Sequence, residues 1–171
     1  MTPYVLTVDA GVRDLRAADH LLHSLSAELA LTEGTFGCTH LLREGRPHVG
    51  LSFALPTEPL LRTALERLGS GGYEVAPGVP DAVGRAVLYP GVSALTGTLS
   101  VADLLDRSAI DRVTVLGSGS RQPDPATVLL TNNHVRPQFQ DGELVLTAMP
   151  AAAGALVPFE VPDPTPCCAD H

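Results

Sequence analysis

The residues best suited to chemistry stand close together, in the run Cys167-Cys168-Ala169-Asp170-His171. Two thiols, a carboxylate and an imidazole supply the soft and borderline ligands that zinc(II) and copper(I) prefer. The prolines that precede this run stiffen the backbone, so the segment could lie against the body of the protein. We therefore expect a transition metal, zinc before copper, bound by Cys167, Cys168 and His171.

A complete tetrahedral site needs help from elsewhere, because adjacent cysteines can share one metal only with strain. His134 is the donor that we expect as the fourth ligand, and the pair Cys38 and His40 is the other available source. Either a structural or a catalytic metal fits these ligands. An open coordination position would allow hydrolytic or lyase chemistry.

Two other classes of function stay open at this point. A thiol-dependent enzyme would use one of the cysteines, with His134 or His171 as the base and Asp141 or Asp170 to orient it. A binding module without metal would instead hold an apolar small molecule on a sheet face, within a homodimer. Arg121 and Arg136 flank the stretch around His134 and could clamp an anionic ligand.

Composition excludes several partners. The chain has 171 residues and a net charge of −8, which argues against nucleic-acid binding, since phosphate contacts need basic groups. All 11 basic residues are arginine, so chemistry that needs a lysine amine is excluded. This usage is typical of a GC-rich bacterial genome.

No apolar run is long enough to span a membrane and no signal peptide is recognisable, so we expect a cytoplasmic protein.

The elements that must position these residues alternate clearly in the first half. β-Branched and apolar runs predict strands, and the i, i+3/i+4 spacing of leucines predicts two helices. His20 and His23 lie off the leucine stripe of the first helix, on a face that we expect to be solvated. The order β-α-β-β-α-β over residues 1–76 predicts a ferredoxin-like unit. In chain order, the predicted elements are strand 4–8, helix 13–31, strands 36–42 and 48–53, helix 57–68 and strand 73–75.

The second half reads mostly as strands. Residues 77–90 are rich in glycine and proline and predict a connection between two units. Residues 91–161 predict a mostly antiparallel β unit with one short helix over 100–106. Its expected strands are 112–116, 127–130, 135–139, 143–147 and 155–161, with a hairpin turn at 140–142. Residues 162–171 form the Pro-rich tail that carries the cysteines. The whole chain is thus predicted to be α+β.

Overall fold

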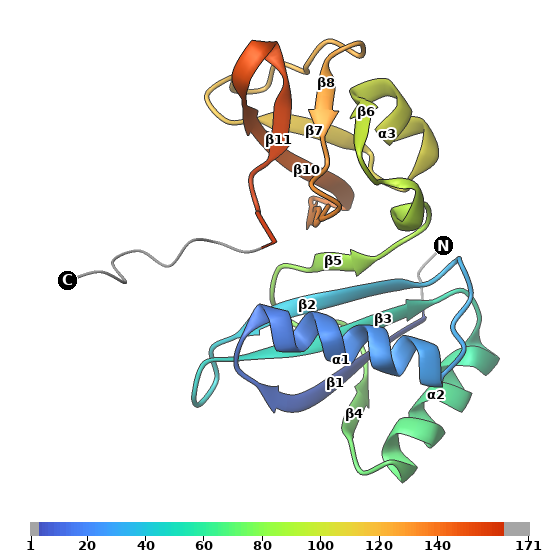
Figure 1. Ribbon diagram of the computed structural model, residues 1–171. Helices are drawn as coiled ribbons and strands as arrows, with labels where there is room; N and C mark the ends of the chain where they lie inside the picture. Colours follow the sequence, from blue (N-terminus) through green and yellow to red (C-terminus); the bar gives the residue numbers. More distant parts are fainter. Residues whose placement is uncertain (1–3, 163–171) are drawn as a thin grey trace.

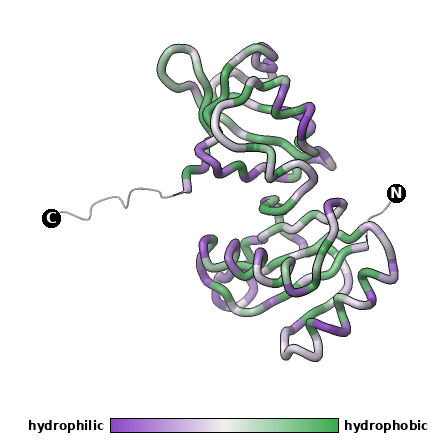
Figure 2. Tube along the Cα trace, turned by 45° about the vertical axis from the view of Figure 1, so that its right-hand side comes forward, coloured by the Kyte–Doolittle hydropathy of each residue, from purple (hydrophilic) through white to green (hydrophobic). Residues whose placement is uncertain are grey.

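The computed structural model describes residues 4–162 and divides them into two lobes (Figure 1). We call residues 4–88 the N-lobe and residues 89–162 the C-lobe. Figure 2 shows the same division, with apolar segments running through the interior of both lobes. The helices of the described residues are α1 (Leu15–Glu28), α2 (Glu58–Ser70) and α3 (Val101–Arg107). The strands are β1 (Tyr4–Val12), β2 (Phe36–Leu42), β3 (His48–Leu55), β4 (Glu74–Pro77), β5 (Arg85–Leu88), β6 (Thr98–Ser100), β7 (Arg112–Val115), β8 (Val128–Leu130), β9 (Gln138–Gln140), β10 (Glu143–Pro150) and β11 (Leu156–Pro158).

The N-lobe is an antiparallel sheet with helices on one face. Its strands lie in the order β4-β1-β3-β2-β5, and each neighbouring pair is antiparallel. Alternate residues of a strand point to opposite faces, so Leu6, Val8 and Phe53 meet α1 and α2 in one buried core. The other face carries Asp9, and residues 80–84 cross part of it. This leaves a sheet face that no helix of the described residues covers (Figure 1).

Helix α1 is shorter than the predicted 13–31. It begins after Asp14, whose carboxylate accepts a hydrogen bond from the Ala17 amide at 2.8 Å and so caps the first turn. It ends at Glu28, because Ala30 adopts a left-handed conformation with φ 51°, which no helix can continue through. The leucine stripe packs inward as the periodicity predicts, and Leu22 and Leu25 are buried.

The C-lobe holds a second core around β10, the longest strand of this half. Parallel pairs join β10 to β7 and β11 to β8, and the remaining strand pairs are antiparallel. Helix α3 contributes Val101 and Leu104 to this core. Gly91 lies so close to the end of α3 that an added Cβ would stand 1.9 Å from the Arg107 carbonyl oxygen, and its φ is +86°. Only glycine fits there.

Strand β5 joins the two lobes. It pairs with β2 through Arg85, Ala86 and Leu88, and with β9 through the single register pair Arg85 and Gln138. The structure thus places a strand within residues 77–90, the stretch in which the sequence suggested a connection. Through this contact, the sheets of the two lobes join into one continuous sheet.

One strand begins later than the pattern suggested. Residues 135–139 were expected to be extended, whereas β9 covers Gln138–Gln140. Pro137 explains the difference, because it has no N–H to donate to a ladder. Its carbonyl oxygen instead accepts a hydrogen bond from the Ala86 amide at 2.8 Å.

The fold class is α+β, as predicted: three described helices accompany a large, mostly antiparallel sheet. Among the described residues, no helix is both long and apolar enough to cross a membrane.

Candidate functional sites

A buried ionic cluster lies where the lobes meet, and Arg85 of β5 is its centre. The guanidinium donates to Asp19 of α1 at 2.7 and 3.2 Å and to Thr39 of β2 at 3.1 Å. It also donates to both carboxylate oxygens of Glu160, which follows β11; Nε lies 2.8 Å from Oε2. Only 8% of the Arg85 side chain is exposed, so its charge depends on these two carboxylates.

His134 and Arg136 complete this arrangement, which we call the junction cluster (Asp19, Arg85, His134, Arg136, Glu160). The Nε2–H of His134 donates to Oε1 of Glu160 at 3.1 Å. The Nε of Arg136 donates to Asp19 at 3.1 Å. Asp19, Arg85, Arg136 and Glu160 each contact an opposite charge of the other lobe, whereas His134 contacts Glu160 within the C-lobe.

The charges of the cluster explain its titration. Burial alone raises the pKa of the Asp19 carboxyl, and the hydrogen bonds and charge of Arg85 outweigh it, so this pKa lies below its usual value. The pKa of Glu160 is lowered in the same way, by Arg85 and by the hydrogen bond from His134. Both carboxylates stay ionised at neutral pH and hold the pKa of Arg85 above its usual value, against the effect of its burial.

The predicted site residues separate into two groups. His134 and Arg136 come together in the junction cluster, whereas Arg121 is exposed in the loop after β7. Within residues 4–162, no hydrogen bond or ion pair brings Arg121 and Arg136 together around a common partner. The remaining predicted ligands, Cys167, Cys168 and His171, lie outside the described residues, and so does Asp170, which was predicted to orient the base. Inside the described part, no group of three or more His, Cys, Asp or Glu side chains could hold a metal ion.

Cys38 and His40 lie deep in the N-lobe sheet. The neutral His40 ring donates from Nδ1 to the Ala82 carbonyl oxygen at 3.2 Å, and its Nε2 accepts from the Ser52 hydroxyl at 2.7 Å. Burial lowers the pKa of His40, which keeps the ring neutral. Burial also raises the pKa of the Cys38 thiol to about 12, against a hydrogen bond with Ser52 that lowers it. Cys38 is therefore protonated at neutral pH and is not a reactive thiolate.

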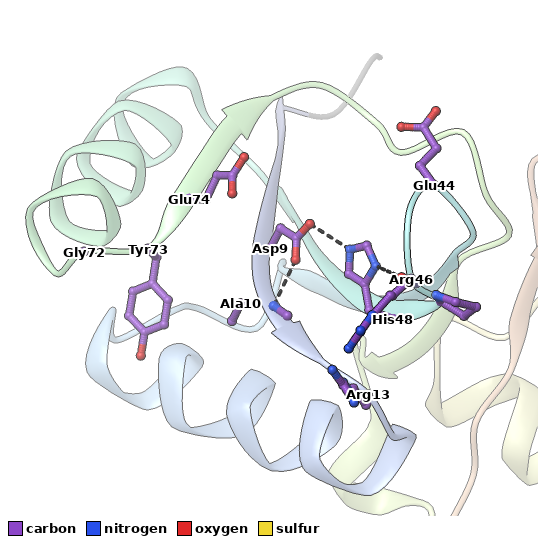
Figure 3. A pocket seen from close by; sticks show the side chains of 11 residues that line it. Asp9, Ala10, Arg13, Glu44, Arg46, His48, Gly72, Tyr73 and Glu74 are labelled. Atoms are coloured by element: carbon purple, nitrogen blue, oxygen red, sulfur yellow. Dashed lines mark hydrogen bonds and ion pairs between the residues drawn. The ribbon is translucent and has the colours of Figure 1, made fainter.

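A second polar site, which the sequence did not signal, lies at the open end of the same sheet face (Figure 3). The Nε2–H of His48 donates to Asp9 at 2.8 Å, and its Nδ1–H donates to the Arg46 carbonyl oxygen at 2.9 Å. Both partners can only accept, so His48 is an imidazolium when both bonds form. The hydrogen bond to Arg46 and the bond and charge of Asp9 raise the pKa of His48.

Local backbone structure aims Asp9 at this histidine. The register between β1 and β3 shifts between Val8 and Val12, and Gly11 adopts a φ of 66° within this bulge. The Gly11 amide donates to the Asp9 carboxylate at 3.0 Å. Burial raises the pKa of Asp9, and this bond and the contact with His48 bring it below the usual value. A cavity of about 700 Å³ borders the pair, with Tyr73 and Glu74 on its far wall (Figure 3).

A larger groove extends from this site along the uncovered sheet face. Its volume of about 1070 Å³ slightly exceeds the roughly 300–1,000 Å³ that is typical of small-molecule sites in proteins. The floor includes Gly50, over which the Leu42 side chain lies: a Cβ on Gly50 would stand 2.7 Å from Leu42 Cδ1. One wall is the segment 76–83, which carries Val79 and Val83. The groove is larger than the cavity beside Asp9 and His48.

No protein-family model matches this chain, and neither do any curated protein or solved structure.

Proposed function

We propose that the protein binds a transition metal, zinc before copper, through Cys167, Cys168 and His171, with His134 as the fourth ligand. One observation supports this best: His134 donates from Nε2 to Glu160, and the chain runs from Glu160 into the Pro-rich tail. A carboxylate that binds one imidazole nitrogen orients the ring and raises its basicity toward a metal at the other nitrogen. Nδ1 of His134 is the nitrogen that would bind.

The distances along the chain are compatible with such a site. Pro162 is the last described residue, and Cys167 follows five residues later. Five extended residues span roughly 17 Å at most, which limits how far from Pro162 the cysteines can bind a metal. Because Arg85 holds both oxygens of Glu160, the start of the tail is anchored at the junction cluster.

Bound metal would give this region a chemical role that the ionic cluster alone lacks. With four protein ligands, zinc would stabilise the tail against the junction. If one position is open, the metal would lower the pKa of a bound water and allow hydrolytic or lyase chemistry.

Elemental analysis of the purified protein tests the proposal. We expect about one zinc or copper per chain in the wild type and none after truncation following Pro166. A Cys167→Ser/Cys168→Ser double variant should also lose the metal, and His134→Ala should reduce it. His23→Ala is the matched control, since His23 is an exposed histidine of α1, and its metal content should equal that of the wild type. The proposal would be contradicted by a metal-free wild type whose melting temperature does not change when zinc or copper is added.

The groove supports a second candidate function, a small-molecule-binding module without metal. The order β1-α1-β2-β3-α2-β4 and the sheet order β4-β1-β3-β2 support a ferredoxin-like N-terminal unit, whose uncovered face would bind the ligand, within a homodimer or alone. The cysteine double variant distinguishes the two functions. Ligand binding that survives the removal of both thiols and of metal supports this candidate.

A further inference from the structure

We infer that the C-lobe carries a docking surface for a second copy of this chain, on the sheet face that points away from the C-lobe core. This surface, the C-lobe face, is formed by apolar side chains of β7, β8, β10 and β11 and of the residues that directly follow β7 and β11. They are Leu116, Val128, Leu130, Met149, Val157 and Phe159. None of them lines the groove or belongs to the proposed metal site, so the inference is independent of both proposed functions.

The register of the sheet makes the apolar surface continuous from β10 to β8. Met149 of β10 pairs directly with Val157 of β11. Leu156 of β11 pairs in parallel with Leu129 of β8, so the next residues of the two strands, Val157 and Leu130, are neighbours as well. Residues that pair across strands point to the same face of a sheet. Three apolar side chains therefore stand side by side.

The same row continues beyond the other edge of β10. Strand β7 runs parallel to β10, and the last pair of the two strands is Val115 with Ala148. The amide of Leu116 donates to the Ala148 carbonyl oxygen at 2.9 Å, which places Leu116 beside Met149. Val115 points into the core of the lobe, so alternation turns Leu116 to the outer face. The row thus contains four apolar side chains from four neighbouring strands.

The row is open to solvent. Leu116 is 47% exposed and Leu130 is 38% exposed, with the half-buried Met149 and Val157 between them. None of the four belongs to either hydrophobic core of the described residues. Two more apolar side chains, each two positions from a member of the row, widen it: Val128, 43% exposed, and Phe159, 59% exposed. Scattered exposed apolar residues need no explanation, whereas a contiguous patch marks an interaction surface.

The charges around this patch select a second copy as the occupant. The chain has a net charge of −8, so two copies repel each other over most of their surfaces. The four strands of the C-lobe face hold only two charged residues, Arg112 and Glu143, and these pair with each other at 2.7 Å. In a symmetric dimer, side chains near the axis meet their own copies, so an unpaired charge there would repel itself. A face without one can meet its own copy, whereas a different partner is usually selected by complementary charge.

Two such faces would stack as sheets about 10 Å apart, with their strands roughly aligned. Four strands at a spacing of roughly 4.8 Å make the row only about 14 Å wide. Interfaces at the small end of the range are weak or transient, so we expect a dissociation constant of about 10–100 μM.

Sedimentation equilibrium of the full chain, from about 1 to 500 μM, tests this inference. We expect monomer at the lowest concentration, dimer at the highest and no larger species. Leu130→Glu and Leu116→Glu should each weaken the dimer at least tenfold, because each buries a carboxylate without a partner. Leu60→Glu on α2 is the matched control: Leu60 is 37% exposed and the added charge is the same, so its dissociation constant should stay within twofold of the wild type. All three positions are exposed, and melting curves check that the variants fold.

Salt provides a second readout. Raising sodium chloride from about 0.05 to 0.5 M should strengthen the dimer, because salt screens the repulsion between two chains of net charge −8. A dimer that is held by ion pairs would weaken instead.

Four outcomes would overturn the inference. The first is a monomer at every concentration. The second is a dimer of equal strength in the wild type, Leu130→Glu and Leu116→Glu, which would place the interface on another surface. The third is an equal loss in Leu60→Glu, which would show that added charge alone prevents association. The fourth is a dimer that weakens with salt, or association that continues past the dimer, since neither fits a neutral face that pairs with its own copy.

Discussion

The junction cluster and the Asp9–His48 pair are built from the same types of side chain, but they differ in exposure. At the junction, the side chains of Arg85 and Asp19 are 8% and 13% exposed, and Arg85 is shared between two carboxylates. At the open end of the sheet, 40% of the Asp9 side chain faces solvent. The first arrangement leaves no charge without a partner, and the second forms the border of a cavity.

This difference shows how burial determines what a cluster of charges can do. Removing one partner of a buried pair leaves a charge in a medium of low polarity, so the whole junction depends on each member. An exposed pair loses little when one partner goes, because water takes its place. The junction cluster is therefore suited to holding the two lobes together and to orienting His134. At the open end, either member of the Asp9–His48 pair can exchange its partner for another polar group.

The largest effect is expected from removing a carboxylate at the junction. Asp19→Ala leaves Arg85 and Arg136 with one carboxylate, Glu160, between them, and should lower the free energy of unfolding by about 3–5 kcal/mol. Asp103→Ala is the control, since this aspartate of α3 is 52% exposed and lies 3.9 Å from Arg107. Its loss should change stability by about 1 kcal/mol or less.

Urea unfolding of the three proteins measures this contrast. Equal losses of stability in the two variants would show that burial does not distinguish the junction from the surface. A changed slope of the transition in Asp19→Ala alone would show that the lobes had come to unfold separately.

A smaller effect, dependent on pH, is expected where His40 lies beneath residues 80–84. Burial lowers the pKa of this ring in the folded protein, whereas the unfolded chain binds a proton near the ordinary value of 6.5. The contribution of neutral His40 is therefore present above pH 6.5 and is lost as the pH falls toward its folded pKa. In melting curves between pH 5 and 8, His40→Gln should have a larger deficit relative to the wild type at pH 8 than at pH 5.

The elements of the N-lobe could be predicted from the sequence because their signals are local. Leucine periodicity predicted α1 and α2, but the predicted 13–31 was too long for α1 at both ends. Its C-terminal end was missed because nothing in the sequence marks the left-handed Ala30. Strand β9 was displaced by Pro137, whose missing N–H the alternation pattern does not weigh. The parallel pairing of β10 with β7 was not expected, because it joins distant segments.

The polar sites were harder to predict, since their members are far apart in the chain. Arg85 stands 66 residues from Asp19 and 75 from Glu160, and it lies in a Gly/Pro-rich stretch that suggested a connection. His48 stands 39 residues from Asp9, and only the register of β1 with β3 could have brought them together. His134 was singled out by its chemistry. Its role as a metal ligand stays a prediction.

The Asp9–His48 pair gives the opposite pH dependence to His40, on the same sheet face. The Arg46 carbonyl and Asp9 raise the pKa of His48 above 6.5, so the folded protein holds a proton that the unfolded chain loses first. The stability from His48 is fully present below pH 6.5 and is lost as the pH rises through the raised value. His48→Gln should therefore have its larger deficit at pH 5 and the smaller at pH 8.

Measured together, the two histidine variants sharpen the comparison. Their stability deficits should cross as the pH rises, with His48→Gln worse at low pH and His40→Gln worse at high pH. Deficits that change in the same direction would contradict the assignment of an imidazolium to His48. NMR titration of the two ring signals provides the independent check, with His48 the later of the two to lose its proton.

The smallest effect is expected at the exposed extreme of the comparison, the pair Glu58–Arg62 on α2. Its atoms lie 3.1 Å apart, yet 61% and 69% of the two side chains are exposed. An i, i+4 pair of this kind stabilises a helix by about 0.3–0.5 kcal/mol, and salt screens it. Arg62→Ala should thus lose about that much stability at low salt and nearly nothing at 1 M sodium chloride. Asp19→Ala should keep most of its loss of stability at the same salt concentration, because ions do not enter the junction. A loss of stability that vanished with salt would place Arg85 in contact with solvent.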